Sequence, residues 1–356
     1  MRVSSVISSV LLAAALTGCG TEPSSPPAST PAYSELPPQK TTVSGIIFDP
    51  EAFYFSLRTF PEVPYSDLVI GIPHLMRSVP VGARVSVVNG DTVADSSEAV
   101  TPAVVWQVPG VPTDATIEYA LRAEPHPEAG GISIGAPDMF PDVEPIPPST
   151  YHPTTSLSPL RTLNTSCVSQ IAMMVGEAGA LSAVASYRTS RGTPTTVADL
   201  LNPAKVAGVA LVWVISPTFF FDFSHQPLGN VEMLKESGDG TVYALDWQTP
   251  GSVAGQSPMG YYVSSASISP IGYYAIVFPA GATEPASLGF TDTVTSPPDA
   301  EPGDFGLRPF PLAPAFVPVR PGVSVLRTFA FPSLSFPPPP EDEEYVPPSD
   351  MSWLCR

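Results

Sequence analysis

The sequence predicts a mainly β protein with two β-sandwich-like domains, joined by proline-rich segments, and one or two short helices at about residues 180–201. Prolines and glycines, 47 and 26 of the 356 residues, disfavour long helices and favour strands joined by turns. Hydrophobic residues make up 43% of the chain, which is enough for packed cores. Short apolar runs separated by Gly, Pro, Asn or Asp recur along the sequence, as they do in β-sandwiches.

An export signal begins the chain. After Arg2, residues 6–16 are apolar except for two serines, and this run is shorter than the about 20 residues that a membrane-spanning helix needs. The run ends in Leu16-Thr17-Gly18-Cys19, which resembles the lipobox of bacterial lipoproteins position by position. An ordinary signal peptide with a stray cysteine is the alternative.

The lipobox resemblance implies a location for the protein. It implies that residues 1–18 are removed as a signal peptide and that Cys19 carries the lipid, palmitate included, which anchors the chain in a membrane. Gly20 stands where many enteric lipoproteins have an aspartate that resembles an inner-membrane retention signal. The outer membrane is therefore favoured, with its periplasmic and surface faces both left open. Residues 19–42 form the lipidated cysteine and a proline-rich tether, which reaches ~70 Å in polyproline geometry.

The charge of the chain limits its partners. A net charge of −18 comes from 33 acidic and 15 basic residues. Such a surface repels phosphate backbones, so nucleic acid is not an expected partner. The same charge argues against electrostatic attachment to anionic head groups, which leaves the acyl chains on Cys19 as the membrane contact. No calcium-binding loop motif is present, and neither a cofactor nor a metal is expected.

The first β-sandwich domain is predicted at residues 43–124. Asn89-Gly90-Asp91 is a strong turn signal within it, because Asn and Gly tolerate positive φ. The expected strands are 43–48, 52–57, 68–72, 84–88, 103–108 and 116–122.

Two segments of this domain carry a further resemblance. Residues 43–49 read Val-Ser-Gly-Ile-Ile-Phe-Asp and residues 79–87 read Val-Pro-Val-Gly-Ala-Arg-Val-Ser-Val. Both resemble the first two strands of carboxypeptidase-regulatory-like β-sandwich modules. The resemblance implies a non-catalytic accessory module and transfers no functional residue. Residues 50–78 separate the two segments, as an inserted hairpin or because the likeness is a coincidence.

The middle of the chain separates the two domains. Residues 125–160 form a proline-rich linker, or an extended strand lying across a domain face. Residues 161–207 form a partly helical connector, in which residues 180–188 contain good helix formers. Thr196 is placed to cap a short helical turn at residues 197–201.

The second β-sandwich domain is predicted at residues 208–331, and residues 332–356 form an acidic, proline-rich tail. Residues 231–235 and 241–247 are expected to form a hairpin around a five-residue loop. The expected strands are 208–215, 231–235, 241–247, 260–263, 272–278, 287–292, 316–320 and 323–329.

Assigning Cys19 to the lipid leaves one possible cysteine pair. Cys167 and Cys355 then lie in an oxidising compartment, where a disulfide is the expected state. Such a bridge would contribute about 4–5 kcal/mol at most in the chain-entropy model. Two separate thiols are the alternative.

Aromatic residues are the candidate ligand-binding set. Neighbours on a strand point to opposite faces, so one residue of each pair, Tyr261-Tyr262 and Tyr273-Tyr274, is expected to face solvent. Together with Trp247, these side chains predict a platform for glycan or peptide. Core packing and the covering of an edge strand are the alternatives.

Two motifs suggest catalysis or metal binding only weakly. Ser133 lies in a Gly-x-Ser-x-Gly sequence, but no helix pattern follows it as in an α/β-hydrolase. Glu124, His126 and Glu128 alternate along an extended segment, where an exposed loop is the simpler interpretation than a metal site. No catalytic residue is assigned.

These observations predict a membrane-anchored envelope lipoprotein with a non-catalytic structural or ligand-binding role. Its expected partners are the membrane, through Cys19, and a glycan, peptide or envelope protein. The alternative is an envelope hydrolase, whose site would bring Ser133 together with His126 or His152 and an acid.

Overall fold

The computed structural model describes residues 40–60, 71–89, 92–96, 105–113, 116–135, 144–160, 162, 166–216, 227–296 and 308–331. The chain divides into two units, residues 1–36 and 37–356, and all described residues lie in the second. The lipobox, Cys19 and the acidic tail with Cys355 lie outside the described residues.

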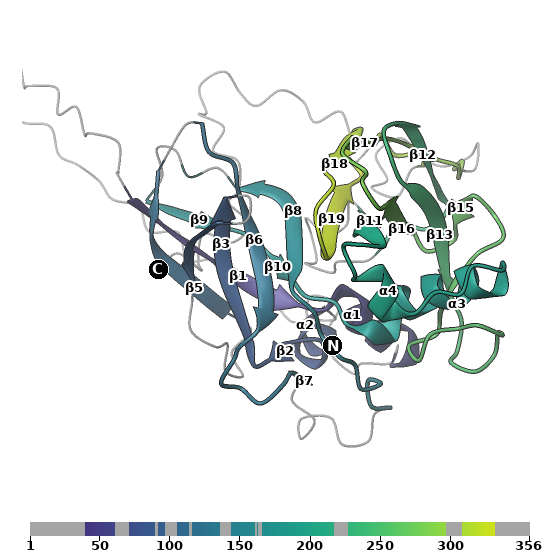
Figure 1. The fold of residues 1–356 in the computed structure, drawn as a ribbon, viewed down its shortest axis with the longest axis horizontal. Coiled ribbons are helices and arrows are strands. Elements are labelled where there is room, and N and C mark those ends of the chain that lie inside the picture. Colours follow the sequence, from purple (N-terminus) through teal and green to yellow (C-terminus); the bar gives the residue numbers. More distant parts are fainter. Residues whose placement is uncertain are drawn as a thin grey trace, which may run out of the picture. The chain divides into compact units, whose positions relative to one another are not determined.

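The described chain is mainly β, as the sequence predicts, with several sheets and a few short helices (Figure 1). The helices are α1 (Pro50–Thr59), α2 (Gly71–Arg77), the π-helical turn η3 (Glu177–Leu181), α3 (Ser182–Ser190) and α4 (Val197–Leu200). The strands are β1 (Lys40–Phe48), β2 (Pro80–Val81), β3 (Ala83–Asn89), β4 (Thr92–Ser96), β5 (Val105–Pro112), β6 (Tyr119–Pro125), β7 (Ser133–Ile134), β8 (Thr154–Leu160), β9 (Cys167–Ser169), β10 (Ala172–Met173), β11 (Val206–Ile215), β12 (Val231–Ser237), β13 (Thr241–Trp247), β14 (Tyr261–Val263), β15 (Ile268–Ser269), β16 (Tyr273–Pro279), β17 (Ala286–Asp292), β18 (Ala315–Val317) and β19 (Val323–Phe329).

One nine-stranded sheet runs through the described unit, in the order β14-β13-β16-β11-β19-β8-β6-β3-β4. Its two halves meet where β8 and β19 pair in parallel, and these strands lie side by side in Figure 1. Two four-stranded sheets, β10-β1-β5 with β9, and β15-β12-β17-β18, accompany it. Both predicted domains therefore contribute strands to a single sheet.

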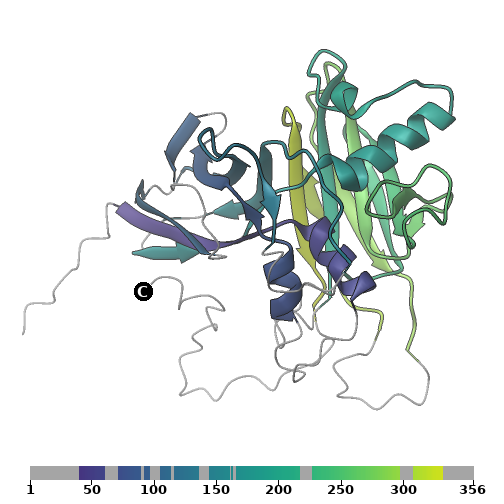
Figure 2. The same cartoon turned by 90° about the horizontal axis from the view of Figure 1, so that it is seen from below.

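Two sandwich-like cores form on this shared sheet. In the first, apolar side chains of β1 and β5 meet those of β3 and β6. In the second, side chains of β12 and β17 meet those of β11, β13 and β16. The helices α1 and α3 cover the other face of β11 and β16, as Figure 2 shows for α3. The domain boundaries drawn from the sequence stay predictions.

The prediction of a strand at residues 52–57 is wrong, because these residues lie in α1. Asp49 caps this helix by accepting hydrogen bonds from the amides of Glu51 and Ala52, at 2.8 and 3.1 Å. Pro50 occupies the first turn, where its missing N–H costs nothing. Aspartate followed by proline is a helix-start signal, and here it outweighs the β propensity of the aromatic residues after it.

The expected hairpin at residues 231–247 is also wrong. β12 and β13 are strands, but they belong to different sheets that pack on each other. The intervening loop, with Gly238 and Gly240 at φ +84° and +97°, therefore crosses from one layer to the other.

The helices expected at about residues 180–201 are confirmed as α3 and α4. Thr196 and Asp199 form a reciprocal capping box at the start of α4. Within residues 125–160, predicted as a linker or as an extended strand lying across a domain face, β8 is a strand inside the nine-stranded sheet. Residues 144–150, before β8, have no regular secondary structure.

Candidate functional site

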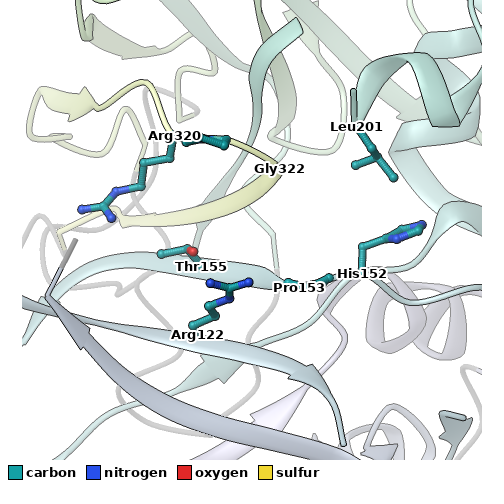
Figure 3. Close-up of a pocket in the computed structure, with 8 residues that line it drawn as sticks. Arg122, His152, Pro153, Thr155, Leu201, Arg320 and Gly322 are labelled. Carbon is teal, nitrogen blue, oxygen red and sulfur yellow. The ribbon is translucent and has the colours of Figure 1, made fainter. Parts of the chain in front are cut away.

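A pocket opens beside β6, β8 and the turn that enters β19, where the two halves of the large sheet meet (Figure 3). Its volume is about 370 Å³, within the range of small-molecule sites, roughly 300–1,000 Å³. The side chains that give it chemical character are Arg122, His152, Thr155 and Arg320, with Leu201 and Gly322 completing the wall.

Arg122 reaches the pocket from β6. Thr155 is its register partner on β8, and Figure 3 shows the guanidinium beside that residue. Arg122 Nε lies 3.5 Å from one carboxylate oxygen of Glu124, whose other oxygen pairs with Arg84 on β3. One carboxylate is thus shared by two guanidinium groups, which leaves an excess of positive charge on this face of the sheet.

Arg320 comes from the turn before β19. Gly322 in this turn has φ +78°, a conformation that glycine adopts without strain. Gly208 lies against the turn so closely that a Cβ there would stand 1.9 Å from the Arg320 carbonyl oxygen. Arg320 Nε is buried and has no hydrogen-bond partner in the described part of the chain. An unpaired buried N–H costs about 1–3 kcal/mol, so an acceptor that reached this atom would stabilise the side chain.

His152 forms another part of the wall, just before β8. Its Nε2 lies 2.7 Å from Glu177 Oε1, and its carbonyl accepts a 3.0 Å hydrogen bond from Thr154 Oγ1. The contact with Glu177 orients the imidazole, which lines the pocket together with Leu201 (Figure 3).

The chemistry of this pocket suits an anion. Two guanidinium groups, which stay charged at any physiological pH, present N–H donors, and Thr155 adds a hydroxyl. None of the lining residues that the structure describes carries a carboxylate. A carboxylate or phosphate ligand would therefore meet donors and positive charge, and arginine suits the planar geometry of either group.

The metal-binding alternative for Glu124, His126 and Glu128 is not supported by their contacts. Glu124 faces Arg84 and Arg122, and His126 Nδ1 accepts a 3.2 Å hydrogen bond from the Glu128 amide. Within the described ranges, no three His, Cys, Asp or Glu side chains are arranged to hold a metal ion.

The expectation that one tyrosine of each pair faces solvent is wrong for Tyr273-Tyr274, because both are completely buried. The strand β16 that carries them is covered on one face by helices and on the other by the β12–β17 sheet. Tyr261 and Trp247 are buried as well, and only Tyr262 of the five is half-exposed. These side chains therefore pack within the protein instead of forming an exposed platform.

The buried aromatic residues instead surround two buried carboxyl groups. Tyr273 Oη donates to Glu51 Oε1 at 2.6 Å, and Tyr151 Oη donates to Asp49 Oδ2 at 2.6 Å. Tyr261 Oη donates to the Glu51 carbonyl at 2.8 Å, while the ring of Trp213 stacks on Tyr273 at 3.7 Å. Sequence reasoning missed this pair of acids, although Asp49-Pro50-Glu51 carries the signal of a helix start.

Burial determines the protonation of these two acids. It raises the pKa of Asp49 to about 6, although bonds from Tyr151 and the amides of Ala52 and Glu51 lower it. Burial and the nearby Asp49 carboxylate raise the pKa of Glu51 to about 8. At neutral pH Glu51 therefore keeps its proton, and Asp49 carries the negative charge at the start of α1.

The serine and histidine residues of the hydrolase alternative are not brought together by their described contacts. His152 binds Glu177 and His126 binds the Glu128 amide, whereas Ser133 lies in β7 paired with β2. A different serine–histidine pair is present and was missed. Ser56 Oγ lies 2.8 Å from His74 Nδ1 and accepts a 2.8 Å hydrogen bond from Arg77.

This Ser56–His74–Arg77 cluster is closed to solvent. Ser56 and His74 are 0% and 1% exposed. Burial and the neighbouring Arg77 lower the pKa of His74 to about 4, so its imidazole is neutral at physiological pH. The cluster joins α1 to α2, and Arg77 extends it to the Glu144 carbonyl.

Cys167 lies in β9, with its sulfur 3.8 Å from Ser44 Oγ. Its predicted partner Cys355 is outside the described residues, so the disulfide stays a prediction. None of the helices in the described ranges has the length and apolar character needed to span a bilayer.

Comparisons with known proteins assign no family to this chain. No family model matches it, and no curated protein matches it. Among solved structures, a double mutant of the shaft pilin SpaA from Lactobacillus rhamnosus GG is similar over 84% of this chain and 99% of that chain. The sequence identity is 10% and the TM-score is 0.19, and a likeness of this degree carries no argument about function.

Proposed function

We propose that this protein is a lipid-anchored envelope lipoprotein of the outer membrane that binds an acidic ligand without catalysing a reaction. The observation that carries the binding role is the pocket at the join of the sheet, which Arg122 and Arg320 both line and whose described lining residues include no acid. The Leu16–Cys19 sequence supports the anchor. The weak resemblance of residues 43–124 to carboxypeptidase-regulatory-like modules agrees with an accessory role.

A hydrolase is the second candidate, and the Ser56–His74 hydrogen bond favours it. A catalytic serine must reach its substrate, and Ser56 is fully buried. Among the described residues, the arginine pocket instead presents polar side chains that a ligand can reach. Binding is therefore the better-supported function.

Replacing Cys19 by serine tests the anchor. Since a serine has no thiol to accept the lipid, the Cys19→Ser protein should move from the membrane pellet to the soluble fraction after cell lysis. The measurement is an immunoblot of both fractions. Cys355→Ser is the matched control and should stay in the pellet. Membrane attachment of the Cys19→Ser protein would contradict the proposal.

A further inference from the structure

A second pocket has a volume of about 250 Å³. Its walls include Tyr187 and Arg188 from α3, Arg191 directly after α3, Lys205 from the turn before β11, and Tyr243 from β13. As in the first pocket, none of the described lining residues is acidic.

The second pocket combines cations with aromatic rings. Tyr187 and Tyr243 meet edge to face with their ring centres 5.8 Å apart, and the Arg191 guanidinium lies 5.2 Å from the Tyr187 ring centre. Lys205 pairs with Asp199 at 2.5 Å, which leaves Arg188 and Arg191 as the cations of the helix end. Aromatic rings and arginine donors thus line the same pocket.

Both pockets border the same short segment of chain. Leu201, directly after α4, lines the first pocket, and Lys205 and Val206, at the start of β11, line the second. The two pockets together hold five of the twelve lysines and arginines within the described residues. Of these five, Lys205 pairs with Asp199 and Arg122 lies 3.5 Å from Glu124, which leaves Arg188, Arg191 and Arg320 as the pocket cations without an ion pair in the described part of the chain.

We propose that the two pockets form one extended site for a short acidic oligosaccharide, with one acidic group in each pocket. This inference rests on the proposed function, because it extends the ligand of the first pocket into the second. The arginines recognise carboxylates, and the faces of Tyr187 and Tyr243 suit the C–H faces of sugar rings. An acidic peptide would use the arginines but gain less from the tyrosine faces.

The two pockets set the length of this ligand. A chain of two or three acidic sugars carries enough acidic groups to place one in each pocket.

Calorimetric titration of the full-length lipidated protein in detergent tests the inference. The probes are D-galacturonate and trigalacturonate, with maltotriose as the neutral sugar and tri-glutamate as the acidic peptide. We expect trigalacturonate to bind at least about ten-fold more tightly than D-galacturonate, since a second bidentate arginine contact adds to the first. Arg191→Gln should remove this difference, so that trigalacturonate is bound no more tightly than D-galacturonate. Lys235→Gln, an exposed cation of β12 outside both pockets, should change neither.

Several results would overturn the inference. If trigalacturonate is bound no more tightly than the monomer, or if tri-glutamate is bound as tightly as trigalacturonate, the extended sugar site is refuted and the first pocket is unaffected. If Arg191→Gln weakens the binding of both sugars equally, the extended sugar site is also refuted. If D-galacturonate itself does not bind, the acidic-ligand function fails, and this inference fails with it.

Discussion

Replacing Glu51 by alanine is expected to lower the free energy of unfolding by about 4 kcal/mol. The Glu51 side chain is fully buried and accepts hydrogen bonds from Tyr273 Oη and the Ala180 amide, both at 2.6 Å. Alanine leaves both donors buried without a partner and opens a cavity beside Gly179, whose Cα lies against the carboxyl group. Urea unfolding followed by tryptophan fluorescence measures the loss.

Glu51 also makes the stability depend on pH. Burial and the Asp49 charge raise its pKa in the folded protein to about 8, above the ordinary value of 4.5. A carboxyl group with a raised pKa stabilises the fold below its ordinary pKa, and this contribution is lost as the pH rises through the folded value. Asp49, with a pKa of about 6, acts in the same direction. Stability should therefore fall between pH 5 and pH 9.

Glu51→Gln separates this effect from the loss of packing. Glutamine keeps an acceptor for Tyr273 and cannot ionise, so its unfolding free energy should change much less than that of the wild type between pH 5 and pH 9. Glu284→Gln, at an exposed position, is the matched control and should keep the wild-type slope. An identical pH profile for Glu51→Gln and the wild type would show that Glu51 does not titrate in this range.

Replacing Arg308 by alanine is the second large effect, expected at about 3–5 kcal/mol. Arg308 Nε donates to both oxygens of Asp292, at 3.1 and 2.9 Å, and a terminal nitrogen donates to Asp292 at 2.6 Å and to the Gly229 carbonyl at 2.7 Å. The Asp292 side chain is 0% exposed. Alanine would leave this carboxylate buried with the Phe310 and Val294 amides as its described remaining donors.

A second lysine- or arginine-to-carboxylate ion pair provides the control for Arg308→Ala. Lys205 and Asp199 form an ion pair that is largely exposed on the lysine side, so Lys205→Ala should cost far less than Arg308→Ala. Thermal and urea unfolding of both variants measure the difference. Equal losses would show that burial of Asp292 does not matter.

Asp292 and the Glu51 pair act at opposite ends of the pH range. Burial raises the pKa of Asp292, but the bonds from Arg308 and two backbone amides outweigh it and hold the pKa below its ordinary 3.8. A lowered pKa gives stability that is present above the ordinary value and lost as the pH falls through the folded one. In Arg308→Ala, acid should therefore destabilise the protein less steeply than in the wild type.

The strands could be predicted from sequence because their signals are local. β11, β13, β16 and β19 each combine an apolar run with turn residues at their ends, and the structure has all four near the expected positions. α1 could be misassigned because its aromatic residues favour strands, while the cap that begins the helix consists of single residues. β8 was obscured by the prolines around it.

The pairing of the strands was not predictable in the same way. β8 pairs with β19, which lies far along the chain, and no feature in the sequence of either strand identifies its partner. The candidate site depends on this pairing, since Arg122 and Thr155 lie on one side of the join and Arg320 on the other. No spacing in the sequence brings these residues together. The one available signal was the scarcity of lysine and arginine, because the few basic residues of so acidic a chain are the candidates for binding an anion.

The aromatic residues show the opposite case. Tyr261, Tyr273 and Tyr274 were selected for their possible exposure, yet all three are completely buried. Alternation along a strand assigns neighbours to opposite faces, but it does not say that either face is exposed. In β16 both faces are covered, by helices on one side and by a second sheet on the other.

Titration of D-galacturonate into the full-length protein and its Arg320→Gln variant tests the acidic-ligand pocket most directly. The wild-type protein should bind, and the variant should bind at least about ten-fold more weakly, because a charged hydrogen-bonded contact contributes ~1.5–3 kcal/mol. Lys235→Gln should bind like the wild type. Equal affinities for the wild type and Arg320→Gln would contradict the assignment of this pocket as the ligand site.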